Sequence, residues 1–92
     1  MTLLEAVESI NGAEVEPSED VVYARKPWVL ESEALIMPAP DYNSVPEAAA
    51  RSEMVYFLEV SITKEVLEGV AANLSSIEEK CLRVIRYAIM DA

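Results

Sequence analysis

The chain carries an excess of negative charge that any fold it adopts has to overcome. It has 17 acidic and 7 basic side chains among 92 residues, without histidine, and its formal net charge is -10. Repulsion among these charges opposes a compact state and must be offset by the burial of apolar surface. Hydrophobic residues make up 52% of the chain and only two glycines occur, so enough apolar material is present for a core. We therefore expect one small globular domain over residues 1–92.

The same composition argues against several partners. A uniformly negative potential repels the phosphate backbone and anionic membrane surfaces, so we expect neither to be bound directly. No apolar run approaches the roughly 20 residues needed to cross a bilayer, and the N-terminus lacks the basic region of a signal peptide. The single cysteine cannot form an internal disulfide, which agrees with a reducing compartment. These observations predict a cytoplasmic protein.

Helical and extended patterns alternate in the first half of the chain. Thr2 and Glu5 fit a capping box that opens a short helix, and Gly12 is placed to close it in a left-handed conformation. The run 21–24 predicts a strand, and the runs 28–30 and 34–37 predict one or two more. Pro46 suits the first turn of a second short helix.

The second half holds the clearest strand and two longer helices. Residues 54–60 are apolar almost throughout, which predicts a central strand, with the Tyr56 ring packed against the core. Thr63 is placed to cap the next helix, and Ser76 with Glu79 forms a second capping box. Together the elements predict an α+β fold. Its small, mostly antiparallel sheet has three to four strands, helices packed on one face and a C-terminal helical hairpin.

Few residues in this chain are suited to catalysis. Without histidine, Ser-His and Cys-His mechanisms are excluded, and one cysteine cannot make a zinc finger. Cys81 falls in the apolar stripe of the last helix, where a thiol acts as a small hydrophobic side chain with a raised pKa. No phosphate loop or calcium loop is present. We expect a protein that is not an enzyme and has no cofactor or metal, with a carboxylate enzyme or metal module as an alternative.

The distribution of charge suggests a binding surface. Acidic residues dominate the loop-rich first half, whereas Lys80, Arg83 and Arg86 share one face of the last predicted helix. Acidic patches attract basic proteins and accelerate their association. An exposed tyrosine in a loop would add an anchor. The residues predicted to contact a partner are Glu14, Glu16, Glu19, Asp20, Glu31, Glu33, Asp41, Tyr42 and Glu47.

The second half also resembles a known class of proteins. The strand 54–60, the helix 65–74 and a last helix opened by Ser76 and ending in 86–92 resemble small acidic bacterial proteins from polymorphic-toxin neighbourhoods, including contact-dependent-inhibition immunity proteins. The resemblance implies a cytosolic inhibitor that binds one toxin domain, often a nuclease, without chemistry of its own.

A stoichiometric, protein-binding inhibitor of a basic toxin is therefore the leading hypothesis for the function. One alternative is an antagonist of a nucleic-acid-binding protein, encoded by a phage or a mobile element. Another is a structural subunit that pairs with a second copy of itself, through a sheet edge or an apolar helix face, as a homodimer.

Overall fold

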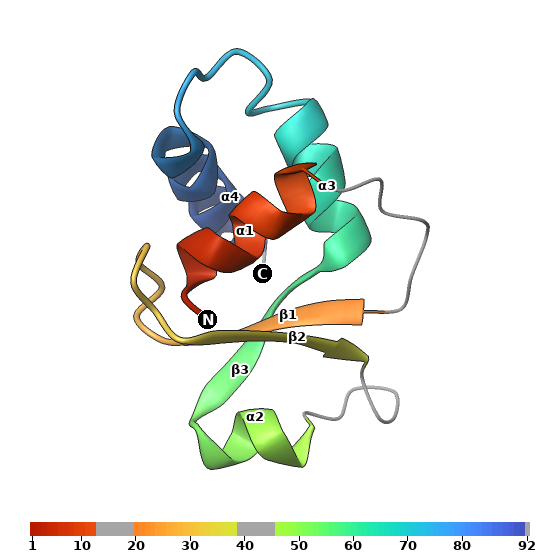
Figure 1. Ribbon diagram of the computed structural model, residues 1–92, viewed down its shortest axis with the longest axis vertical. Coiled ribbons are helices and arrows are strands. Elements are labelled where there is room, and N and C mark those ends of the chain that lie inside the picture. Colours follow the sequence, from red (N-terminus) through yellow and green to blue (C-terminus); the bar gives the residue numbers. More distant parts are fainter. Residues whose placement is uncertain (13–19, 39–45, 92) are drawn as a thin grey trace.

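The computed structural model describes residues 1–12, 20–38 and 46–91, which form four helices and three strands. Their order along the chain is α1 (Leu3–Gly12), β1 (Asp20–Arg25), β2 (Ala34–Pro38), α2 (Glu47–Arg51), β3 (Met54–Glu59), α3 (Val60–Glu68) and α4 (Ile77–Asp91). The predicted α+β class is confirmed, and the small sheet is antiparallel throughout (Figure 1).

The strand at the centre of the sheet is β1, because the strand order is β2-β1-β3. Its residues 21–24 are all buried, and Ala24 pairs with Ala34 of β2 and with Val55 of β3. The prediction that residues 54–60 form the central strand is therefore wrong, since β3 lies at an edge. Residues 28–30 form no strand but belong to the connection between β1 and β2.

An irregularity in β3 directs two neighbouring side chains into the same core. Val22 pairs with Leu58 while Tyr23 pairs with Tyr56, so Phe57 is an extra residue opposite the β1 ladder. Such a bulge breaks the alternation of side chains between the two faces. As a result, both Phe57 and Leu58 belong to the main hydrophobic core.

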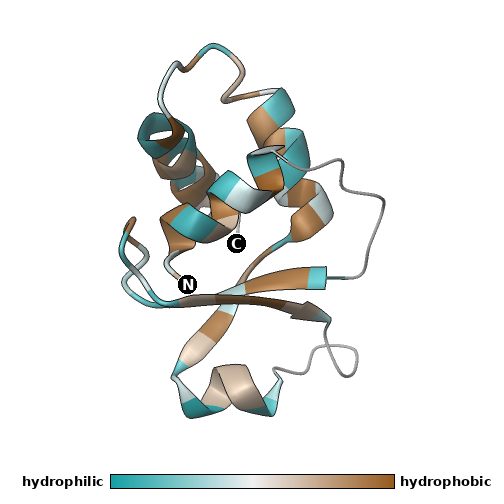
Figure 2. Ribbon diagram, in the orientation of Figure 1, coloured by the Kyte–Doolittle hydropathy of each residue, from teal (hydrophilic) through white to brown (hydrophobic). Residues whose placement is uncertain are grey.

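Helices cover both faces of the sheet, although the sequence predicts helices on one face only. α1 and α3 lie against one face, and α4 packs on these two helices, so that α3 and α4 form the predicted C-terminal hairpin (Figure 1). On the opposite face, Ala49 of α2 closes a small second core with Val21, Tyr23 and Met54. The strands can therefore carry apolar side chains on both faces, and Figure 2 colours most of their length as hydrophobic.

The two ends of α1 differ in how well they match the local predictions. Thr2 and Glu5 form the predicted capping box: each backbone nitrogen donates to the other residue's side chain, at 2.8 and 3.1 Å. The hydrogen bond that the Thr2 backbone nitrogen donates to the Glu5 carboxylate is the largest cause of the lowered pKa of Glu5. Gly12 is not left-handed; instead, the Lys64 ammonium lies 3.4 Å from the Asn11 carbonyl oxygen, at the negative end of α1.

The predicted caps of the two later helices have different outcomes. Ser76 accepts a hydrogen bond from the Glu79 nitrogen at 3.1 Å, as a cap of α4 should. Thr63 does not cap α3, which begins three residues earlier at Val60; its hydroxyl donates to the Glu59 carbonyl at 3.0 Å. The Ser76 cap is therefore confirmed, whereas the one at Thr63 is wrong.

Trp28 anchors the connection between β1 and β2. Its ring meets Phe57 edge to face with centroids 4.8 Å apart, and its indole nitrogen donates to the Ala24 carbonyl at 3.2 Å. Trp28 is accordingly half-buried and packs against the main core. The nearly buried Ser32 hydroxyl donates to the Pro27 carbonyl and accepts from the Val29 nitrogen, which fixes the turn.

We expect Phe57→Ala to lower the free energy of unfolding by about 3–5 kcal/mol, because the ring is 1% exposed and its loss leaves a cavity beside Trp28. The measurement is urea denaturation followed by circular dichroism. Val55→Ala on the same strand is the matched control and should cost less, since Val55 is 39% exposed. Equal losses in the two variants would contradict the burial of Phe57 in the main core.

Candidate protein-binding surface

The structure places only part of the predicted acidic surface. Glu14, Glu16, Glu19, Asp41 and Tyr42 lie outside the described residues. The remaining four, Asp20, Glu31, Glu33 and Glu47, are described, and none of them is fully buried. These four residues therefore show where the described part of the predicted acidic surface lies.

The four described carboxylates lie in different parts of the fold. Asp20 pairs with Pro38 at one end of the β1–β2 ladder, whereas Glu31 and Glu33 lie in the connection beyond the other end. Glu47 begins α2, which covers the face of the sheet opposite α1 and α3. Glu31 and Glu33 are near each other because they are two residues apart in the chain. The structure does not gather all four side chains into one patch.

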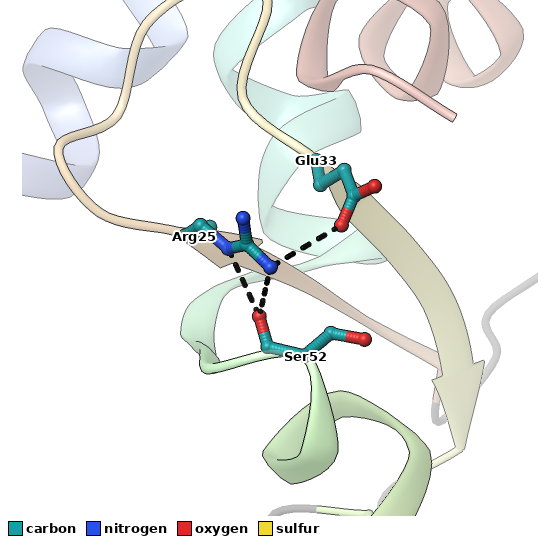
Figure 3. Close-up of polar contacts among 3 residues, drawn as sticks. All are labelled: Arg25, Glu33 and Ser52. Carbon is teal, nitrogen blue, oxygen red and sulfur yellow. Dashed lines mark hydrogen bonds and ion pairs between the residues drawn. The ribbon is translucent and has the colours of Figure 1, made fainter.

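Two of these carboxylates already have a positively charged neighbour. Glu33 lies 3.6 Å from the guanidinium of Arg25, which also donates twice to the Ser52 carbonyl, at 2.9 and 3.0 Å (Figure 3). Glu47 pairs with Arg51 one helical turn later. Arg25 therefore links the end of β1 to the residue before β2 and to the turn before β3. The negative charges of Glu33 and Glu47 are each partly compensated by a neighbouring arginine.

A different surface lies at the free edge of β3. Within the described residues, β3 pairs only with β1, so its other edge has no strand partner. Val55 and Tyr56, at the middle of the strand, are 39% and 48% exposed. Glu53 and Glu59, on either side of them, are exposed and make no ion pair with another described residue. We call these four residues, Glu53, Val55, Tyr56 and Glu59, the β3 edge surface.

The backbone of Glu53 is unusual. Its φ is +59°, and it is the one described residue other than glycine with a positive φ. This left-handed conformation costs about 1–2 kcal/mol for a residue with a Cβ atom, and glycine or asparagine usually occupies it. The fold itself gains little from a glutamate here, because the side chain is exposed and forms no ion pair within the described chain.

The prediction that the Tyr56 ring packs against the core is wrong, because Tyr56 is 48% exposed. Partial desolvation raises the pKa of Tyr56, and the nearby Glu59 carboxylate raises it further. The sequence contains a signal for this surface, since Glu53 and Glu59 bracket the apolar run 54–58. The two glutamates indicate an edge strand only to a reader who already knows the strand order.

Cys81 is fully buried, and desolvation raises its pKa to about 11, as expected for a structural thiol. Among residues 1–12, 20–38 and 46–91, no three Cys, Asp or Glu side chains are grouped closely enough to hold a metal ion. Within those same ranges, no helix has the length and hydrophobicity required to span a bilayer.

Comparisons with protein-family models, curated proteins and solved structures found no match to this chain.

We expect the raised pKa of Cys81 to make stability fall at alkaline pH. Below about pH 9 the thiol keeps its proton in both states; between about pH 9 and 11 only the unfolded chain loses it, so unfolding becomes more favourable. Urea denaturation at several pH values measures this change. The decline over that interval should be shallower in Cys81→Ala, and identical pH dependence in both proteins would contradict the buried thiol.

Proposed function

We propose that this chain is a stoichiometric inhibitor that binds a basic partner protein and is not an enzyme. The observation that supports the proposal is the β3 edge surface, where a strand that pairs on one side only, within the described residues, presents apolar side chains between two exposed carboxylates. The net charge of -10 adds a long-range attraction for a positively charged partner. The resemblance to immunity proteins suggests a toxin of the nuclease type, neutralised in the cytoplasm.

An exposed strand binds an extended segment by adding it to the sheet. The free backbone groups of β3 would form hydrogen bonds with the partner, while side chains on alternate positions select its sequence. Val55 and Tyr56 would contact apolar residues, and Glu53 and Glu59 would pair with lysine or arginine at the ends of the segment. The preferred partner segment is therefore an apolar strand bracketed by basic residues.

The charges at the ends of β3 also disfavour pairing of this edge with its own copy. In an antiparallel pair centred on Tyr56, Glu53 of one chain faces Glu59 of the other, at both ends. Like charges directly opposite one another destabilise a strand pair. A basic partner removes this repulsion, and its bound basic residues are no longer available to nucleic acid. In this way binding alone can inhibit a nuclease or another nucleic-acid-binding protein.

The proposal is tested with the product of the neighbouring open reading frame as the first candidate partner. Isothermal titration should give a 1:1 complex, and the enzymatic or nucleic-acid-binding activity of the partner should fall in proportion to the amount of complex. Glu53→Lys with Glu59→Lys should weaken binding by at least about tenfold, because two attractive charge pairs become repulsive. The affinity of the unchanged chain should decrease with added salt.

Glu8→Lys with Glu65→Lys is the matched control. It changes the net charge equally, and both residues are exposed and form no ion pair with a described residue, but they lie on α1 and α3 rather than on β3. Equal weakening by both double variants would show that only total charge matters, which contradicts the β3 edge surface. If the complex forms but the activity of the partner persists, the inhibitory function is wrong.

A further inference from the structure

The two exposed apolar side chains of the β3 edge surface lie on opposite faces of the sheet. Val55 pairs with Ala24, which belongs to the main core beneath α1 and α3. Tyr56 pairs with Tyr23, which belongs to the second core beneath α2. Residues that pair across two antiparallel strands direct their side chains to the same face. The β3 edge surface is therefore apolar on both faces, at two consecutive positions.

A strand added to this edge would extend two rows of apolar side chains. One row crosses the sheet from Ala34 of β2 to Val55, on the face that α1 and α3 cover (Figure 1). The other row crosses from Leu35 of β2 to Tyr56, on the face that α2 covers. The next side chain in each row comes from the bound segment, and these two residues are neighbours in its chain because side chains alternate between faces.

We infer that the β3 edge binds a segment with two consecutive aliphatic residues, flanked on both sides by lysine or arginine. This specificity rests on the proposed function and names the class of segment that the edge accepts. An amphipathic strand alternates apolar and polar residues, so it sets a polar side chain against either Val55 or Tyr56. Consecutive aliphatic residues cover both, while the basic ends of the segment reach Glu53 and Glu59.

The opposite edge of the sheet is less open to such a segment. The N-terminus lies along the start of β2, where the Met1 carbonyl accepts a hydrogen bond from the Ala34 nitrogen at 2.8 Å and Thr2 forms a bridge with Glu33. Among the described residues, none pairs in this way with the outer edge of β3. The glutamate beside β2 already has an arginine neighbour, whereas the two of the β3 edge surface have no ion pair with a described residue.

Two peptides of identical composition, KKTVVTKK and KKVTVTKK with acetylated and amidated ends, test the inference. The valines are consecutive in the first and alternate in the second, while the charge is the same. In either chain direction, the first peptide can set its valines against Val55 and Tyr56 together, with lysines opposite Glu53 and Glu59. Titration of isotope-labelled chain at low ionic strength, followed through the amide chemical shifts of residues 54–59, gives both dissociation constants. The peptide with consecutive valines should bind at least about fivefold more tightly.

Three variants show whether this preference arises at β3. V55T and Y56T each make one face of the edge polar, so each should reduce the preference to below about twofold. V70T is the matched control, because Val70 is 51% exposed but lies outside β3, and it should leave the preference unchanged. Circular dichroism verifies that each variant is folded, and the comparison of the two peptides on the unchanged chain does not depend on any variant.

Three results would overturn the inference. They are equal affinities of the unchanged chain for the two peptides, a preference that survives both V55T and Y56T, and the absence of amide shifts in residues 54–59 with either peptide. The measurement uses no natural partner. The preference can therefore fail while the chain still inhibits its partner, or hold while the activity of that partner persists, so the failure of this inference is distinguishable from the failure of the proposed function.

Discussion

The burial of β1 on both faces is the constraint on which the rest of this fold depends. Residues 21–24 are all buried, and the strand is hydrogen-bonded to β2 on one side and β3 on the other. Val22 and Ala24 belong to the core beneath α1 and α3, while Val21 and Tyr23 belong to the core beneath α2. A small acidic chain can thus bury apolar side chains on both sides of one strand, which offsets its charge repulsion.

Local features of this fold could be predicted from the sequence because they depend on residues three or four positions apart. The Thr2–Glu5 capping box and the Ser76 cap need only a hydroxyl and a nearby backbone nitrogen. The burial of Cys81 follows from the periodicity of one helix. The class of the fold follows from the order of such elements.

Features set by distant pairing could not be predicted in the same way. The sequence has two apolar runs of this kind, 21–24 and 54–60. Neither run indicates which of the two strands lies at the centre of the sheet. The exposure of Tyr56 and the position of α2 on the second face both follow from that choice. The pairing of Glu33 with Arg25 is also a result of strand register, so its partial neutralisation is visible only in the structure.

The late position of β3 in the chain has a consequence for biosynthesis. β1 ends at Arg25, but the strand that completes its second edge begins at Met54, and α4 ends only at Asp91. While the ribosome is still adding these last elements, the emerging first half lacks Phe57 and Leu58 of its own core. Long-range pairings of this kind form slowly and leave apolar surface accessible to chaperones. The main core can therefore be completed only after β3, α3 and α4 have been synthesised.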